Sequence, residues 1–326
     1  HWLAMPDVRV TILCDAKRLP ADGDFSSVSG NIGGGPPIKV DPTRVRLTPN
    51  FDELLADPAT DIVDICVPTV AHKALVLAAL QAGKHVVCEK PLARTAADAY
   101  EIARAAEQAR GILLPAMVIR FWPEYRWLRE AIADRRFGEV IAARFTRLSE
   151  PPSWSPEFMD GARSGGALLD LHIHDVDFVQ YCFGAPLEVS AVGRIVRSGA
   201  VDHVSALYRV RSGAVVSAEG GWVMTPGFGF VMSWQVLWER ATAEYDCRRG
   251  ADALRLIQPG HPPCTIAVPG SDGYRAELEY AVECVRTGAH PTIVTARDAA
   301  HAIAICEAEE ESVRRGGEAV PDLRMN

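Results

Sequence analysis

The segment Lys84-His85-Val86-Val87-Cys88-Glu89-Lys90-Pro91 decides the fold. Its apolar centre, residues 86–88, predicts a short buried strand that ends at a charged pair and a proline. Before it, residues 71–81 have the spacing of a helix. A helix followed by a buried strand predicts a βαβ rhythm, which places Glu89 and Lys90 at the carboxyl end of a parallel strand. In an open α/β sheet, ligands bind at that edge.

A lysine at this edge has two interpretations. It can hydrogen-bond a substrate hydroxyl and share its proton while an alcohol is oxidised. Alternatively, Glu89 and Lys90 form a surface ion pair ahead of a proline turn, which is a common and weak interaction. The tripeptide by itself favours the ion pair.

Composition describes an ordinary globular protein. The 326 residues, 48% hydrophobic and 23% charged, are enough for two domains with separate cores. The net charge of −8 argues against nucleic acid or an anionic membrane as a partner. No apolar run reaches the ~20 residues of a membrane span, and no basic segment followed by an apolar one opens the sequence, so secretion is not expected. Eight cysteines without a C-x-x-C pair predict free, mostly buried thiols, so we expect a cytoplasmic protein without a metal site.

The N-terminal region predicts one cofactor contact and lacks another. Residues 8–13 form a β-branched run that is followed by Cys14 and Asp15. An acidic residue closing the second strand of a dinucleotide fold accepts hydrogen bonds from the adenosine ribose, although Asp15 can also be a plain turn residue. Lys17 and Arg18 follow closely and leave NADP possible. The glycine-rich fingerprint should come about 20 residues earlier, yet none of the fourteen residues before Asp15 is glycine.

We therefore expect that this sequence begins inside the first helix of the domain, at residues 1–4, and that the native chain is longer. The glycine-rich residues 30–35 do not replace the fingerprint, because two prolines follow them instead of a helix. Residues 19–46 are predicted to form a long loop.

After residue 138 the pattern changes to alternation of apolar and polar residues, which predicts a mostly antiparallel sheet with one face packed on helices. The open face is expected to carry Trp, Val and Met and to contact another subunit. The alternating segments are 141–148, 187–196, 204–211, 214–219 and 230–237. Two final helices are predicted at 276–286 and 297–314, with Glu307 to Glu311 on a solvated face.

A second chemical motif follows Gly165-Gly166. Asp170 and His174 are four residues apart in a predicted helix, so their side chains can meet on one face. A carboxylate beside an imidazole fixes its tautomer and raises its basicity. His172 and His174 with nearby aspartates could instead form a metal cluster, but residues two apart point to different helix faces, so no metal is predicted. Asp175 is expected to complement the helix dipole.

Together these segments resemble the Gfo/Idh/MocA oxidoreductase family, which takes in glucose-fructose oxidoreductase and inositol dehydrogenases. The motifs are residues 61–68, His72, residues 78–91 and the segment 165–174, and the similarity runs from about residue 8 to the C-terminus. It implies an α/β Rossmann-type, doubly wound parallel sheet in residues 1–118. It also implies an α+β substrate-binding and oligomerisation domain, built on an open antiparallel sheet, in residues 119–326.

The resemblance also implies the site. His174 is the expected general acid/base, Asp170 orients it and the sugar hydroxyl, and Lys90 completes the proton relay. Arg120 and Trp122 border the substrate pocket, although a hinge packed on tryptophan is an equal interpretation of them. The expected cofactor-binding residues are Asp15, Pro68, Thr69, His72, Glu89 and Lys90, and the expected substrate-binding residues are Arg120, Trp122, Trp154, Asp170 and His174.

The function expected from this resemblance is an NAD(P)-dependent dehydrogenase acting on a sugar, inositol or related polyol, with NAD favoured through Asp15. Family members pair through the open sheet face, so a homodimer or homotetramer is implied. Two alternatives stay open. One is a glycosidase or epimerase with a closed redox cycle, and the other is a non-catalytic regulator that binds cofactor and sugar.

Overall fold

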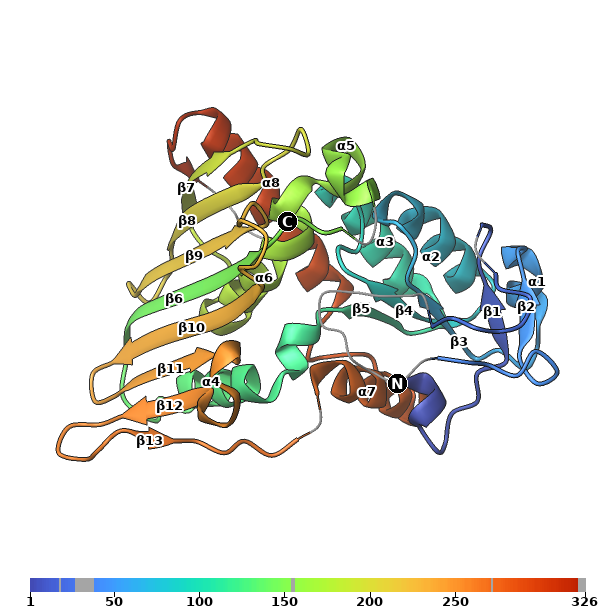
Figure 1. Ribbon diagram of the computed structural model, residues 1–326, viewed down its shortest axis with the longest axis horizontal. Coiled ribbons are helices and arrows are strands. Elements are labelled where there is room, and N and C mark those ends of the chain that lie inside the picture. The colour runs from blue at the N-terminus through green and yellow to red at the C-terminus, as the bar shows by residue number, and fades with distance from the viewer. Residues whose placement is uncertain (18, 27–37, 154–155, 271, 322–326) are drawn as a thin grey trace.

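The structure is a computed structural model in which residues 1–17, 19–26, 38–153, 156–270 and 272–321 are described. It has a small part built on parallel strands and a larger part built on a broad sheet (Figure 1). The glycine-rich residues 30–35 and much of the predicted loop at 19–46 lie outside the described residues. Trp154 lies outside them too.

The parallel strands form two separate sheets. Strands β3 (Ile62–Ile65), β4 (His85–Glu89) and β5 (Leu113–Ala116) pair in that order. Strands β1 (Ile12–Cys14) and β2 (Arg46–Thr48) pair only with each other in the described part of the chain. The Rossmann-type sheet predicted from the sequence is therefore present in two pieces, with no ladder between β1 and β3 among the described strands.

Helices cover both faces of the β3–β4–β5 sheet. Figure 1 shows α2 and α3 on one side of these strands and α7 on the other. Burial on both faces explains why residues 86–88 are uniformly apolar, since each is at most 3% exposed. The α-helices are α1 (Phe51–Ala56), α2 (His72–Gln81), α3 (Ala96–Gln108), α4 (Pro123–Ala133), α5 (Gly161–Ser164), α6 (Ile173–Phe183), α7 (Gly273–Thr287) and α8 (Ala296–Arg314).

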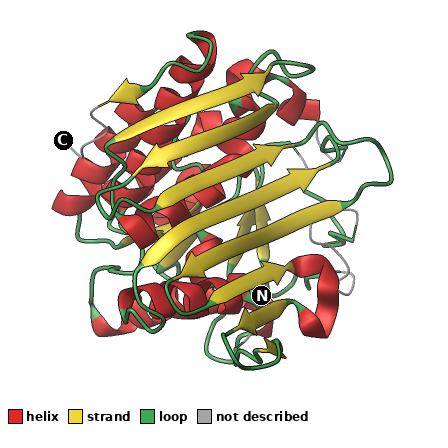
Figure 2. Ribbon diagram, turned by 90° about the vertical axis from the view of Figure 1, so that its left-hand side faces the viewer, coloured by secondary structure: helices red, strands yellow, loops and turns green. Residues whose placement is uncertain are grey.

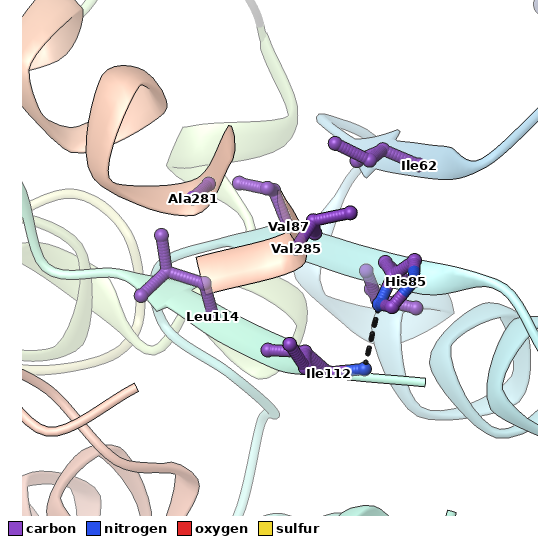
Figure 3. A pocket seen from close by; sticks show the side chains of 8 residues that line it. Ile62, His85, Val87, Ile112, Leu114, Ala281 and Val285 are labelled. Atoms are coloured by element: carbon purple, nitrogen blue, oxygen red, sulfur yellow. Dashed lines mark hydrogen bonds between the residues drawn. The ribbon is translucent and has the colours of Figure 1, made fainter. Parts of the chain in front are cut away.

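A small cavity lies between α7 and the three strands (Figure 3). Its walls are apolar apart from His85, whose Nδ1 accepts a hydrogen bond from the Ile112 backbone N–H at 3.1 Å. His85 is the first residue of β4. The cavity therefore lies at the end of the strand opposite Lys90, and it is a packing gap and not a substrate site.

The larger sheet has nine strands within the described residues, in the order β13-β12-β11-β10-β6-β9-β8-β7-β14. Every neighbouring pair is antiparallel except β6 with β9. The strands are β6 (Val140–Ser149), β7 (Glu188–Arg194), β8 (His203–Arg209), β9 (Val215–Gly221), β10 (Phe230–Trp238), β11 (Thr242–Asp246), β12 (Leu254–Ile257), β13 (Cys264–Thr265) and β14 (Val320–Pro321).

One face of this sheet is open and the other packs on helices (Figure 2). The expectation that tryptophan lies on the open face is wrong. Trp234 and Trp238 are 1% exposed and pack against aromatic side chains of α4 and its following turn. Valine does lie on the open face as expected, since Val192 and Val215 are each 60% exposed there among serine, arginine and glutamate side chains.

Short turns complete the chain. The 3₁₀ turns are η1 (Trp2–Ala4), η2 (Thr69–Ala71), η3 (Val118–Phe121), η4 (Pro156–Met159) and η6 (Cys247–Asp252), and η5 (Leu168–His172) is a π turn. All eight cysteines are free thiols, of which Cys88, Cys284 and Cys306 are buried and Cys66 and Cys264 exposed. Within the described ranges, none of the helices has the length and apolarity to cross a membrane.

Candidate active site

Lys90 and Asp170 meet across the two parts of the molecule. Lys90 directly follows β4, whereas Asp170 lies in the π turn η5. The Lys90 ammonium donates to Asp170 Oδ1 at 2.7 Å and to the Asp170 backbone oxygen at 2.6 Å. The two side chains are 18% and 14% exposed. The lysine predicted at the strand edge is therefore held by a largely buried carboxylate, and the surface ion pair with Glu89 is not what anchors it.

The π turn changes the predicted role of Asp170. The sequence predicted an α-helix in which Asp170 hydrogen-bonds His174, but the Asp170 carboxylate binds Lys90 instead. His174 belongs to α6, which follows the π turn, and its Nδ1 has no hydrogen-bond partner. Single π turns next to α-helices occur frequently at functional sites. Here the Asp170 backbone oxygen is one of the groups that reach Lys90.

His174 is a neutral imidazole at neutral pH. Burial lowers the pKa of His174 well below its usual value, and the positive charges of Lys90 and Arg147 lower it further. The ring is neutral and its Nδ1 has no partner, so it can accept a proton, but the lowered pKa makes it a weaker base than an exposed histidine. The structure thus brings Lys90, Asp170 and His174 into one region. The predicted contact between Asp170 and His174 is replaced by the contact between Asp170 and Lys90.

Two buried ion pairs hold α6 in place. Arg147 on β6 donates to both carboxylate oxygens of Asp175 at 2.9 Å. Arg120 on η3 donates to both oxygens of Asp177 at 2.8 and 2.7 Å. All four side chains are at most 3% exposed. Asp175 lies in the first turn of α6, where an acidic residue complements the helix dipole as expected, and its carboxylate is in addition bound to Arg147.

The same geometry bears on the predicted substrate contacts. The Arg120 guanidinium also donates to the Ile293 backbone oxygen and to Asp298, so each of its three nitrogens is hydrogen-bonded within the protein. This favours the hinge interpretation of Arg120 over a substrate contact. Trp122 is partly exposed and stands edge-on to Tyr274, with ring centroids 6.1 Å apart. A side chain at Gly273 would meet Trp122, since an added Cβ would lie 2.7 Å from its ring.

The residues predicted to bind the cofactor differ in exposure and in their hydrogen bonds. Pro68 is exposed and precedes η2, and Thr69 is its first residue. Glu89 Oε2 accepts the Lys90 backbone N–H at 3.1 Å, and burial raises the pKa of the Glu89 carboxyl. Asp15 is exposed after β1 and accepts the Lys17 backbone N–H at 2.7 Å, as a turn aspartate does.

His72 is buried among backbone groups. Its Nδ1 lies 2.9 Å from the Pro91 carbonyl oxygen and its Nε2 lies 2.8 Å from the Val67 carbonyl oxygen. The residue is 1% exposed. Because both ring nitrogens are engaged within the protein, the geometry favours the packing interpretation of His72 over direct contact with a cofactor.

Sequence reasoning missed two buried charged residues near the site. Arg147 occupies an inward position on an alternating strand, and a charge at such a position predicts a buried partner. Glu277 lies on the buried face of α7, is 3% exposed, and its Oε1 has no partner. Burial, followed by the charges of Glu89 and Asp64, raises the pKa of Glu277 well above its usual value.

Two family models match the chain. One, described as the GFO/IDH/MocA C-terminal domain, matches residues 125–244. The other, described as an oxidoreductase family with an NAD-binding Rossmann fold, matches residues 39–116. Together they cover more than half of the chain. The protein belongs to the Gfo/Idh/MocA family, as its two motifs predicted.

Curated relatives are similar over part of their length. Trans-1,2-dihydrobenzene-1,2-diol dehydrogenase of Mus musculus is 37% identical over 166 residues, which are 50% of each chain. 1,5-Anhydro-D-fructose reductase of Ensifer adhaerens is 36% identical over 174 residues, covering 51% of this chain and 52% of that protein. Myo-inositol 2-dehydrogenase of Thermotoga maritima is 36% identical over 171 residues, 50% of each. The chain thus spans about half the length of the curated relatives it matches.

Solved structures share the fold over most of their length. Aldose-aldose oxidoreductase from Caulobacter crescentus, complexed with glycerol, superposes with a TM-score of 0.76 at 24% identity, covering 87% of this chain and 85% of that one. Levoglucosan dehydrogenase in complex with NADH superposes with a TM-score of 0.75 at 21% identity, covering 84% and 83%. These similarities confirm the predicted fold class, a parallel Rossmann-like sheet followed by a large, mostly antiparallel one.

Proposed function

We propose that the protein is an NAD(P)-dependent oxidoreductase that transfers a hydride between a nicotinamide and a hydroxyl-bearing carbon of a sugar, inositol or related polyol. The observation that carries this proposal is the buried contact between Lys90 and Asp170, which lies at the carboxyl edge of the parallel strands. The neutral His174 in the same region supplies a proton acceptor. Family membership and the names of the relatives support a redox reaction at a carbinol carbon.

The carboxyl edges of the parallel strands carry candidate contacts for the two ends of a dinucleotide. Thr69 lies after β3, Glu89 ends β4 and Lys90 follows it, where a nicotinamide would lie, and Asp15 follows β1, where the adenosine ribose would lie. The part of the chain that the structure describes has no glycine-rich turn between a strand and a helix, so these residues account for the two ends and not for the pyrophosphate. Asp15 favours NAD over NADP. When bound, the nicotinamide supplies the hydride acceptor.

The side chains would divide the proton transfer between them. The Lys90 ammonium would donate a hydrogen bond to the substrate oxygen, and neutral His174 would accept the hydroxyl proton as the carbon is oxidised. Asp170 would hold Lys90 in position through its carboxylate and its backbone oxygen. In the reverse direction the protonated His174 would return the proton. Trp122 is a candidate wall of the substrate pocket.

The domain organisation of the chain is part of the same proposal. Residues 1–118 would bind the dinucleotide, and residues 119–326 would bind substrate and form a homodimer or homotetramer through the open face of the large sheet. Support for the latter comes from the area of that face and from the exposed Val192, Leu207 and Val215 on it. The eight free thiols support a reducing, cytoplasmic location.

Turnover with a defined panel tests the proposal. The purified protein is mixed with NAD or NADP and with myo-inositol, levoglucosan, D-glucose or glycerol, and reduced nicotinamide is followed by its near-ultraviolet absorbance. The expected result is reduction with at least one polyol and a loss of about 10²- to 10⁴-fold in Lys90→Met and His174→Asn. Bound NAD without net reduction would instead indicate a closed redox cycle. Absence of both binding and turnover would overturn the proposal.

A further inference from the structure

His72 is placed between two strand ends. It is the first residue of α2 and lies directly after η2. Its Nε2 is 2.8 Å from the carbonyl oxygen of Val67, which follows β3, and its Nδ1 is 2.9 Å from the carbonyl oxygen of Pro91, which follows Lys90. One side chain therefore spans the two segments that leave adjacent parallel strands at the candidate active site.

Both neighbours of the ring are hydrogen-bond acceptors. A carbonyl oxygen cannot donate, and a neutral imidazole carries only one N–H, so the neutral ring satisfies one carbonyl and a doubly protonated ring satisfies both. Burial lowers the pKa of His72, the Lys90 charge adds to this, and the carbonyl contacts oppose it. The ring is 1% exposed, so water does not compete for these contacts.

The backbone around Lys90 is consequently held from two sides. The Lys90 ammonium is bound by Asp170, and the next residue along the chain is bound by His72. A lysine side chain is long and flexible, so its placement depends on where its backbone is fixed. Movement of the Pro91 carbonyl would move the point from which the lysine reaches Asp170.

We propose that His72 is a positioning residue that fixes the Lys90–Pro91 backbone to the end of β3 and thereby sets the Lys90–Asp170 contact. The inference rests on the proposed function, because it gives His72 a part in placing the proposed catalytic lysine. It assigns His72 no contact with the cofactor or the substrate.

Chemical labelling of lysines tests this without any substrate. The chain has five lysines, Lys17, Lys39, Lys73, Lys84 and Lys90. Trace acetylation followed by mass spectrometry gives the reactivity of each. In His72→Asn, whose shorter amide cannot occupy the positions of both ring nitrogens, the Lys90 ammonium should spend more time away from Asp170, so Lys90 should be acetylated several-fold faster. Lys39, on a distant exposed segment, serves as the internal reference.

His85→Asn is the matched control. His85 is also a histidine that hydrogen-bonds backbone in the same sheet, but it lies at the opposite end of β4. Its substitution should leave Lys90 labelling unchanged. Thermal unfolding checks that each variant is folded, and His72→Gln is the second variant, with a longer amide, should His72→Asn fail to fold.

The outcomes separate this inference from the proposed function. If Lys90 labelling rises in the His72 variants and kcat falls about 10- to 100-fold with a smaller change in KM, both stand. If labelling rises but the unsubstituted protein turns over no polyol, His72 positions Lys90 while the proposed function fails. Folded His72 variants with unchanged Lys90 labelling would overturn the inference whatever the activity.

Discussion

Replacing Asp170 by asparagine removes the charge opposite Lys90 while keeping the shape of the side chain. The Lys90 bond to the Asp170 backbone oxygen at 2.6 Å is unaffected, and the bond to Oδ1 at 2.7 Å loses its ionic character. A hydrogen bond between charged groups contributes about 1.5–3 kcal/mol. Both side chains are less than a fifth exposed, so solvent screening is modest. The asparagine Oδ1 still accepts a neutral hydrogen bond of about 0.5–1.5 kcal/mol, so the expected loss is about 1–1.5 kcal/mol, or roughly 5- to 13-fold in the population of the contact.

The assay follows Lys90 directly. Because the amine must leave Asp170 before it reacts, trace acetylation of Lys90 should rise by roughly that factor in Asp170→Asn, and kcat/KM for any polyol substrate should fall comparably. Glu188→Gln is the control, since Glu188 pairs with Arg209 in an exposed ion pair that contributes at most about 1 kcal/mol. Equal Lys90 reactivity in Asp170→Asn and the unsubstituted protein would show that the carboxylate does not hold the lysine.

Three further predictions concern stability. Arg147→Met should lower the free energy of unfolding by about 3–5 kcal/mol in denaturant titrations, because it strands the buried Asp175 carboxylate, and adding Asp175→Leu should restore most of it; a double variant no more stable than the single one would contradict this. Glu277 has a raised pKa in the folded state, so its contribution is present at low pH and is lost as pH rises through that value. Glu277→Gln should therefore stabilise the protein by roughly 1–3 kcal/mol near pH 8 and change little near pH 4, and an identical difference at both values would refute the assignment of a buried acid. His174 has a lowered pKa, so the unfolded chain binds its proton first and stability should decline as pH falls below about 6.5; His174→Asn should flatten that decline, and an unchanged pH profile would count against it.

The edge of the parallel sheet could be predicted from the sequence for a physical reason. A strand buried on both faces must be apolar throughout, so residues 86–88 identify β4, and the charges that follow it mark the strand end. The period-two alternation likewise located five strands of the large sheet. It did not tell the inner face from the outer one, because both faces carry apolar residues, and tryptophan was expected on the open face although Trp234 and Trp238 are buried.

The π turn was beyond sequence reasoning because tertiary contacts set it. His172, inside the turn, has its Nε2 3.2 Å from Glu309 on α8. Tyr208 on β8 donates to the same carboxylate at 2.6 Å. Gly220 on β9 makes room for the ring, since an added Cβ would lie 2.5 Å from its Nδ1. The expectation of a fully solvated glutamate face at 307–311 was wrong for this reason, as Glu309 is completely buried.

Local patterns also could not assign the partners of Asp170. Spacing alone pairs it with His174, four residues on, whereas the fold brings Lys90 from 80 residues away. The candidate site residues could therefore be identified from the sequence. Their hydrogen-bond partners could not, because these depend on how the two parts of the molecule pack together.

The most direct test of the proposed chemistry is to follow the hydride itself. The protein is incubated with NAD and with sugars and inositols deuterated at their carbinol carbons, and the nicotinamide is analysed by mass spectrometry. We expect deuterium on the nicotinamide ring with the unsubstituted protein and with His85→Asn, and almost none with Lys90→Met. Bound nicotinamide that acquires no deuterium from any of these substrates would contradict the proposed chemistry.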